Sequence, residues 1–167
     1  VIDDILMFVV HLAGTLGDRL APIALRGSSM GGYLAILAAA EGAARRVRTH
    51  AVVAICPANG EQLIRGLREE RFAFAADAPA VEAFLSAHDL RTAAAGLSQP
   101  VLLLHAEGDE RVPIAHSREL SEVLTAPGSR LIAVPGGHHR SIQHDEELQA
   151  VSLRFIQQSL GVSRGAR

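Results

Sequence analysis

Short apolar runs alternate with longer segments of helical periodicity along the chain. The runs at 22–25, 51–56, 101–105 and 131–134 are dominated by Val, Ile, Leu and Ala. Apolar residues at successive positions are typical of parallel strands that helices cover on both faces. The four runs therefore predict the strands of a mostly parallel sheet.

Helical spacing of apolar residues occupies most of the sequence between these runs. It predicts helices over 2–16, 30–46, 114–124 and 144–160. The regular alternation of strand and helix is the pattern of an α/β protein. We therefore expect a single α/β domain over residues 1–167, with a sheet of about four strands and flanking helices.

The interval 58–99 departs from this alternation. It has no strand pattern, but helical pieces are predicted at 60–71 and 79–88, and Asp77 and Pro79 favour the start of the second piece. An interval of this length is too long for an ordinary connection. We interpret it as a helical lid over the functional site; the alternative is a helical layer that does not contact substrate.

Composition and charge argue against several classes of function. The 16 basic and 18 acidic residues give a formal net charge of −2 without a basic stripe, which argues against nucleic-acid binding. No apolar stretch reaches membrane-spanning length, and the first residues do not resemble a signal peptide. The single cysteine, Cys56, ends a strand-like run and is expected to be buried in a protein of a reducing compartment. We therefore expect a cytoplasmic protein without a membrane span.

The most specific motif joins the first strand to the helix that follows. Residues 27–31 read Gly-Ser-Ser-Met-Gly, a G-x-S-x-G sequence between the apolar run 22–25 and an alanine-rich helix. In this setting the motif is typical of a nucleophile elbow, a strained turn that exposes a reactive serine, here Ser29. The turn leaves little space for neighbouring side chains, a requirement that Gly27 and Gly31 would meet.

The start of this helix would stabilise negative charge beside the serine. Its unpaired N–H groups and the positive end of its dipole point toward the turn, so the N–H of Met30 is the expected first donor to an oxyanion. The motif also occurs by chance, and a turn rich in Gly and Ser could instead bind phosphate or serve only as architecture. Further parts of a catalytic site would favour the first interpretation.

A catalytic serine needs a histidine base and a carboxylate that orients the base. The strand at 101–105 runs into a glycine-containing loop with three acidic residues. This loop presents Asp109, with Glu107 and Glu110 as alternatives. A solvated acidic loop without a catalytic role would have the same composition.

The strand at 131–134 opens into a loop with two glycines and two histidines. The glycines allow the loop to carry a histidine over the strand ends, so either His138 or His139 could be the base. Adjacent histidines can also bind a metal, but only His144 and Asp145 follow at ligand spacing, so no metal site is expected. The remaining histidines are assigned to packing, helix caps or the surface: His11, His50, His88, His105 and His116.

The three motifs, in this order, resemble the α/β-hydrolase superfamily, in which serine, acid and histidine follow one another along the chain. Residues 105–113 are similar to the family's H-G-x-x-D-x-x-V-P stretch, with Ala106 in place of the glycine, which selects Asp109. Residues 135–140 are similar to P-G-x-x-H-R, which selects His139. The resemblance implies a catalytic triad of the elbow serine, the acid and the histidine, without a cofactor.

The activity that the resemblance implies is hydrolysis of small or medium apolar acyl esters through an acyl-enzyme intermediate. Apolar side chains of the expected lid favour such substrates: Leu67, Phe72, Phe74, Phe84 and Leu85. A lysophospholipase, peptidase or thioesterase of the same fold would use the same residues. The alternative is a degenerate, non-catalytic fragment that keeps the elbow as architecture.

The resemblance covers only the C-terminal part of the superfamily fold. Several strands precede the elbow in the superfamily, and an early loop supplies a second oxyanion donor, whereas here only the helix at 2–16 precedes the elbow strand. We therefore expect a partial hydrolase of low activity, since one such donor contributes about 10²–10³ in turnover. The strand with Ile23 and Leu25 would be an uncovered sheet edge, open to a dimer or another partner.

Overall fold

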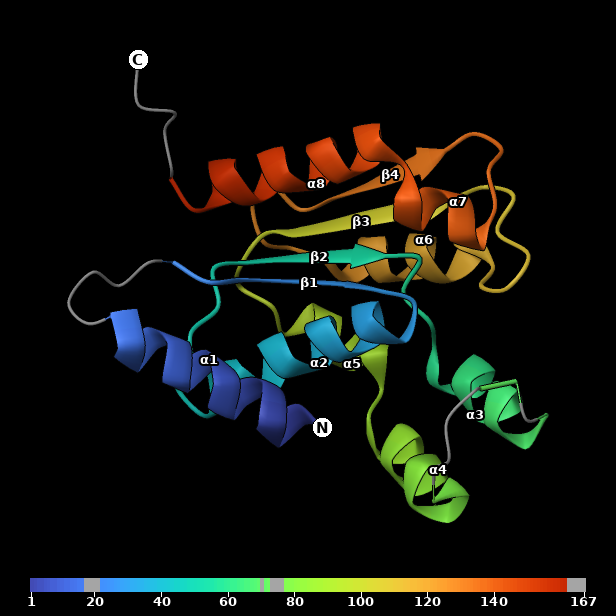
Figure 1. Cartoon of the computed structure of the whole chain (residues 1–167), viewed down its shortest axis with the longest axis horizontal. Helices are drawn as coiled ribbons and strands as arrows, with labels where there is room; N and C mark the ends of the chain where they lie inside the picture. Colours follow the sequence, from blue (N-terminus) through green and yellow to red (C-terminus); the bar gives the residue numbers. More distant parts are fainter. Residues whose placement is uncertain (17–21, 70, 73–76, 162–167) are drawn as a thin grey trace.

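A parallel sheet forms the centre of the molecule, as predicted (Figure 1). The computed structural model describes residues 1–16, 22–69, 71–72 and 77–161. The strands lie side by side in their sequence order, and each pairs in parallel with its neighbour. Their bounds are β1 (Ala24–Ser28), β2 (Ala51–Ile55), β3 (Val101–Ala106) and β4 (Arg130–Val134).

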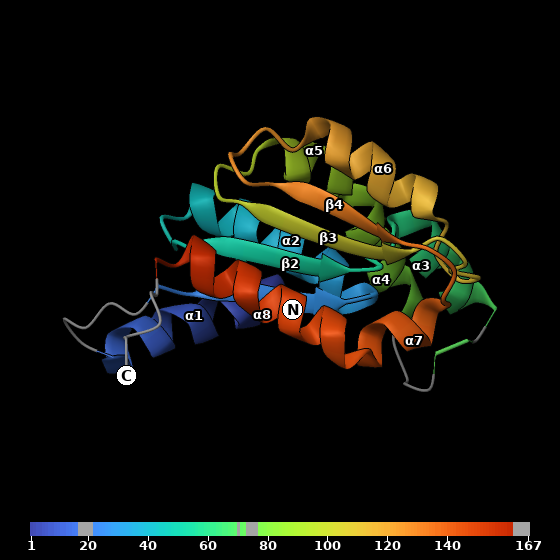
Figure 2. The same cartoon turned by 90° about the horizontal axis from the view of Figure 1, so that it is seen from above.

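Helices cover both faces of the sheet (Figure 2). Right-handed connections between successive parallel strands place the intervening helices on one face. That face carries α2 (Met30–Ala44), α5 (Leu90–Ala95) and α6 (Ile114–Val123), with α1 (Ile2–Leu16) packed against α2. The helices that follow the last strand, α7 (His139–His144) and α8 (Glu146–Ser159), lie on the opposite face.

Two apolar cores result from this arrangement. Every residue of β2 and β3 is buried. Val52 and Leu103 belong to the core beneath α2, whereas Val53 and Leu102 belong to the core beneath α8. Coverage on both faces explains why successive residues of these strands are apolar.

The predicted bounds of the first strand, 22–25, are wrong. β1 begins at Ala24 and continues through Gly27 and Ser28, because these residues pair with β2. Polar residues can continue the strand since it lies at the sheet edge, where Arg26 is exposed. The serine of the elbow therefore follows directly on a paired strand.

The helix predicted over 144–160 is confirmed as α8, although it begins at Glu146 rather than at His144. Asp145 separates α7 from α8, and its carboxylate caps α8 by accepting a hydrogen bond from the Leu148 N–H at 2.9 Å. An N-cap residue has a non-helical backbone, so it interrupts the helical run. The histidine loop consequently passes into a short helix of its own.

Two helices of the expected lid project beyond the carboxyl ends of the strands (Figure 1). These are α3 (Gly60–Arg68) and α4 (Ala78–Ala87), which an ion pair of 2.7 Å between Arg68 and Glu82 joins. Within the same interval α5 packs against α2 and α6 instead. Only part of the interval 58–99 thus has the position expected of a lid.

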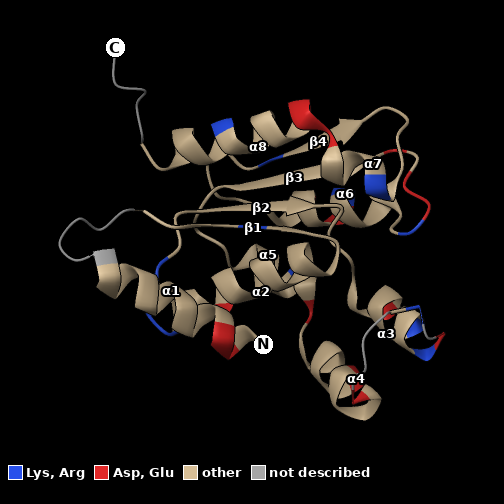
Figure 3. Ribbon diagram, viewed as in Figure 1, with Lys and Arg blue, Asp and Glu red and all other residues tan. Residues whose placement is uncertain are grey.

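Acidic and basic residues are spread over the described helices, strands and loops (Figure 3), in keeping with the balanced composition. None of the described helices is both long and apolar enough to cross a membrane. Among the described strands, β1 lies at one edge of the sheet and pairs only with β2. On α1, Met7, Phe8 and Val10 leave more than half of their surface exposed.

Candidate active site

Ser29 occupies a strained turn between β1 and α2. Its φ of 54° and ψ of −119° lie in a region that side-chain-bearing residues rarely adopt. The Ser29 N–H donates to the Ile55 carbonyl at 2.8 Å, and the Ser29 carbonyl accepts from Ala58 N–H at 3.1 Å. Strain of this kind persists only where the surroundings fix the backbone, as the segment after β2 does here.

The two motif glycines differ in how closely other atoms approach them. A Cβ atom on Gly27 would lie 2.1 Å from the Gly31 carbonyl oxygen, whereas one on Gly31 would meet nothing within 4 Å. On Gly32 it would lie 3.2 Å from the Cα of Pro57. The steric requirement predicted for Gly27 is therefore present, whereas the one predicted for Gly31 is wrong. Gly32, which follows it, is the second glycine whose surroundings are crowded.

A pair of alanine substitutions tests this difference. Gly27→Ala should destabilise the protein by about 3 kcal/mol or more, because the methyl group overlaps backbone atoms that cannot move independently. The melting temperature should then fall by roughly 6–12 °C. Gly31→Ala should leave it unchanged or slightly raised, since alanine favours a helix start in open space. Equal losses in the two variants, measured by thermal unfolding, would contradict the assignment.

The start of α2 offers N–H groups beside Ser29. The Ser29 carbonyl accepts from the N–H groups of Gly32 and Tyr33 at 3.0 and 3.1 Å. Met30 and Gly31 precede them, and N–H groups in the first turn have no intrahelical acceptor. Their position is compatible with the predicted oxyanion role of Met30, which stays a prediction.

Asp109 is held rigidly in the loop after β3. Its side chain is fully buried. One carboxylate oxygen, Oδ1, accepts from the N–H groups of Arg111 and Val112, both at 2.8 Å. The other, Oδ2, accepts from Nδ1 of His139 at 2.7 Å. Every described neighbour in these bonds is a donor, so the loop is built around an ionised carboxylate.

The electrostatics of Asp109 follow from these contacts. Burial alone would raise the pKa of the carboxyl group, but hydrogen bonds from His105, His139 and the backbone outweigh burial and hold the pKa of Asp109 well below its ordinary value of 3.8. Asp109 is therefore ionised throughout the physiological pH range.

The alternative acids take other positions. Glu107 forms an exposed ion pair with Arg118 at 3.4 Å. Glu110 accepts from the backbone N–H of His139 at 3.1 Å and does not contact the ring. Glu110 thus anchors the start of α7, while Asp109 is the carboxylate that contacts the imidazole.

His139, the predicted base, is the first residue of α7 and is 4% exposed. The residue was expected in the loop after β4, but it lies in a helix that His138 caps. Its neighbour His138 forms the cap: Nδ1 of His138 accepts from the Ser141 N–H at 3.2 Å. The His138 ring thus caps the helix, and of these two adjacent histidines it is His139 whose ring is hydrogen-bonded to Asp109.

The acid and histidine loops pack backbone against backbone. A Cβ atom on Gly108 would lie 2.4 Å from the Gly137 carbonyl oxygen, and the Gly108 N–H donates to the Gly136 carbonyl at 3.2 Å. Small residues at these positions let the two loops approach closely enough for the bond between Asp109 and His139.

Cys56 connects this pair to the elbow. It follows β2 directly, with a φ of 43°, and its Sγ lies within 4.8 Å of ligand atoms of both Asp109 and His139. Ile55, just before it, and Ala58, two residues after it, form hydrogen bonds with the backbone of Ser29. All three predicted triad residues therefore border one short segment at the carboxyl end of the sheet.

Cys56, Asp109 and His139 lie close enough to one another to be considered as metal ligands. However, the 2.7 Å between Nδ1 of His139 and Oδ2 of Asp109 is the length of a hydrogen bond. Burial, with a further contribution from the Asp109 carboxylate, raises the pKa of the Cys56 thiol to about 12. The arrangement favours a shared proton and an un-ionised thiol over a metal site.

The reactivity of Cys56 should reflect this environment. With its pKa raised from 9.0 to about 12, the thiolate fraction near pH 8 falls about a thousandfold. A thiol reagent should modify the native protein at least that much more slowly than the protein unfolded in guanidinium, where the same cysteine is free. Rapid modification of the folded protein would contradict the assigned environment.

A cavity of about 390 Å³ lies beside the elbow, with a nearly continuous apolar lining. Met30, Tyr33 and Leu34 of α2 line one side, and α3 and α4 contribute the side opposite: Leu63, Leu67, Val81, Phe84 and Leu85. Phe72 lines it as well. Phe74, which was expected to contribute, lies outside the described residues.

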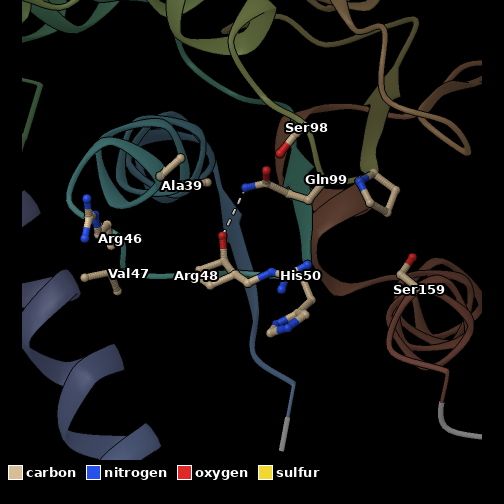
Figure 4. Close-up of a pocket in the computed structure, with 11 residues that line it drawn as sticks. Ala39, Arg46, Val47, Arg48, His50, Ser98, Gln99 and Ser159 are labelled. Atoms are coloured by element: carbon tan, nitrogen blue, oxygen red, sulfur yellow. Dashed lines mark hydrogen bonds between the residues drawn. The ribbon is translucent and has the colours of Figure 1, made fainter. Parts of the chain in front are cut away.

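A second cavity, of about 570 Å³, lies at the opposite end of the strands (Figure 4). Thr49, His50 and Pro100, which precede β2 and β3, line it together with Arg46 and Arg48. It is therefore remote from Ser29, and we assign it no part in catalysis.

Sequence reasoning missed three residues of the site. Cys56 was treated as a packing residue, although a cysteine before Pro57 at the end of a strand could have signalled an unusual turn. Gly32 received no role beside Gly31. His105 was among the histidines assigned to packing, helix caps or the surface, yet in the H-x-x-x-D spacing it lies four residues before Asp109, at the end of β3.

Comparisons with known proteins place this geometry in a family. Residues 2–163 match the model of the Prolyl oligopeptidase family. A search of curated proteins found no match. Among solved structures, an esterase from Pyrococcus furiosus is similar, with a TM-score of 0.71 and 22% identity over 96% of this chain and 62% of that chain.

Two further structures are similar. Est1E from Butyrivibrio proteoclasticus has a TM-score of 0.65 and 21% identity over 92% of this chain and 67% of that chain. A monoacylglycerol lipase from Paleococcus ferrophilus has a TM-score of 0.62 and 18% identity over 97% of this chain and 76% of that chain. At these identities the likeness shows the fold, of which the chain spans about two thirds. Because the family model covers nearly the whole sequence, the chain belongs to the prolyl oligopeptidase family of the α/β-hydrolase superfamily.

Proposed function

We propose that the chain carries the catalytic triad of a serine hydrolase that cleaves carboxylic esters. The observation that carries this proposal is the bond between His139 Nδ1 and Asp109 Oδ2, at the strand ends where the elbow also lies. Because the ionised carboxylate can only accept, Nδ1 carries the proton and Nε2 is left free to accept one. His139 is thereby prepared to act as a general base toward Ser29.

The proposed reaction has two halves. Ser29 Oγ attacks the acyl carbonyl carbon and transfers its proton to Nε2 of His139, while the Met30 N–H stabilises the oxyanion. Collapse of the tetrahedral intermediate breaks the ester C–O bond, and the departing alcohol takes the proton from His139. Water then attacks the acyl-serine with His139 again as the base, which releases the carboxylic acid and restores Ser29.

The apolar cavity beside Met30 supports an apolar acyl or alkyl group as the neighbour of the scissile bond. Its lining from α3 and α4 is apolar and would desolvate such a group, and Asp77, at the start of α4, is a charged residue at its wall. The names of similar structures, an esterase and a monoacylglycerol lipase, agree with an ester substrate.

Hydrolysis of a series of p-nitrophenyl esters tests the proposal. We expect turnover of acetyl to octanoyl esters, with KM falling as the chain lengthens and fills the cavity. Absence of turnover for every ester, in protein that is shown to be folded, would favour the non-catalytic alternative.

The family match makes peptide hydrolysis the second candidate. A peptidase and an esterase would share the triad, and they would differ in the leaving group that the site accepts. A proline-containing peptide p-nitroanilide, assayed beside the ester series, discriminates between them. A higher kcat/KM for the anilide would replace the ester assignment.

A further inference from the structure

His105 is a fully buried histidine at the end of β3, behind the catalytic acid. Both of its ring nitrogens are engaged. Nε2 lies 2.8 Å from the Val112 carbonyl oxygen, and Nδ1 lies 2.6 Å from Oγ of Ser117 on α6. Because the carbonyl can only accept, Nε2 carries the proton, and the Ser117 hydroxyl then donates to Nδ1. The ring is therefore fixed in one tautomer and one orientation.

These bonds close the loop that carries Asp109. Nε2–H of His105 reaches the Val112 carbonyl, and the Val112 N–H donates to Asp109 Oδ1 at 2.8 Å. The same Nε2 lies 3.5 Å from Asp109 Oδ2, the oxygen that accepts from His139. Oδ2 therefore lies between two imidazole rings, one from β3 and one from α7.

The two carboxylate oxygens consequently have separate supports. Backbone N–H groups of Arg111 and Val112 fix Oδ1, while the rings of His105 and His139 face Oδ2. Rotation of the carboxylate away from His139 would break bonds on both oxygens. The His105 ring is in turn tied through Ser117 to α6, on the face of the sheet opposite α7.

We propose that His105 is a positioning residue that, through Ser117 on one side and Val112 on the other, holds the Asp109 carboxylate in line with His139. The inference rests on the proposed function, because only a catalytic Asp109 needs this orientation. A residue that merely fills the core would contribute through its volume, whereas the proposed role depends on the proton at Nε2.

Three substitutions separate these roles. His105→Phe keeps a ring of similar size and removes both nitrogens. His105→Gln is expected to restore an N–H donor toward the Val112 carbonyl. Leu104→Ala, at the fully buried neighbouring position on β3, is the control for lost packing without any polar change.

In ester hydrolysis, His105→Phe should lower kcat by about 10–100-fold with KM little changed, the effect of a misplacement of about 1 Å at the reacting groups. His105→Gln should recover most of that loss. Leu104→Ala should keep kcat within a few-fold of the parent protein while its melting temperature falls. Ser117→Ala, which keeps the His105 ring, should lower kcat by a smaller factor.

A proton NMR measurement reports on the hydrogen bond between Asp109 and His139 without requiring any turnover. A buried proton shared between His139 Nδ1 and Asp109 Oδ2 should give a far-downfield, slowly exchanging signal, identified by its absence in His139→Ala. We expect this signal to be lost or broadened in His105→Phe and retained in His105→Gln and Leu104→Ala. If the parent protein shows the signal but hydrolyses nothing, the proposed function fails while the role of His105 can still be decided.

The proposal is overturned if folded His105→Phe keeps both the kcat and the downfield signal of the parent protein. It is equally overturned if Leu104→Ala loses as much kcat as His105→Phe. Should His105→Phe not fold, Ser117→Ala decides, since unchanged kcat and an unchanged signal in that variant would remove the proposed link to α6.

Discussion

Replacing Ser29 by alanine is expected to lower kcat for ester hydrolysis by about 10⁴–10⁶, the largest effect of any single substitution in the chain. The alanine has no hydroxyl to attack the acyl carbon, so no acyl-enzyme can form. The burst of product that precedes steady turnover should disappear as well, which a stopped-flow measurement at high protein concentration would show.

The neighbouring serine supplies the matched control. Ser28 is the last residue of β1 and takes part in the sheet through its backbone. Ser28→Ala changes the same functional group one position away, so it should keep kcat within a few-fold. A rate that survives in Ser29→Ala, or is abolished by Ser28→Ala, would mean that the nucleophile has been assigned to the wrong residue.

Asp109→Asn should lower kcat by about 10⁴ at neutral pH. The asparagine amide can present an N–H group to Nδ1 of His139, which would favour the tautomer with its proton on Nε2 and leave no base for Ser29. The shape of the loop should survive, because the amide oxygen can still accept from the Arg111 and Val112 N–H groups. Circular dichroism of the variant should therefore match that of the parent protein.

Glu110→Gln is the control for this second prediction. Its carboxylate accepts from the His139 backbone, a role that an amide oxygen can also fill, so only a small loss of kcat is expected. A loss in Glu110→Gln as large as that in Asp109→Asn would move the acid to position 110.

The lowered pKa of Asp109 also makes a prediction about stability. The folded-state pKa lies below the ordinary value of 3.8, so the unfolded state binds a proton first as the pH falls. The stability that ionised Asp109 contributes is thus fully present above about pH 4 and decreases on acidification toward the folded-state pKa. The difference in urea midpoint between the parent protein and Asp109→Asn should narrow from pH 7 to pH 3. A difference that widens would contradict the direction of the shift.

Local patterns in the sequence predicted the sheet and the three strand-end turns that carry the candidate site residues. Buried parallel strands must be apolar at successive positions, so β2 and β3 are visible in the sequence as continuous apolar runs. The elbow and the acid and histidine loops each follow a strand, which brings them to one end of the sheet in any parallel arrangement. Resemblance was needed to select His139 over His138, since both lie in the same loop.

The features that sequence reasoning missed depend on contacts between distant segments. Ser28 belongs to β1 because of pairing with β2, not because of its own preference for strands. Gly32 is constrained by Pro57, and Gly31 faces open space, a difference that depends on the packing of β2 against the elbow. The link from His105 to Ser117 joins a strand to a helix. None of these contacts leaves a periodic signal in the sequence.

The central claim is that Ser29 is a nucleophile activated by His139 and Asp109. Labelling with a fluorophosphonate, followed by intact-mass measurement and peptide mapping, tests it most directly. We expect one adduct, located on Ser29, that is absent in Ser29→Ala and strongly reduced in His139→Ala. An adduct on another residue, or none on folded parent protein under conditions that label a known serine hydrolase, would contradict the account.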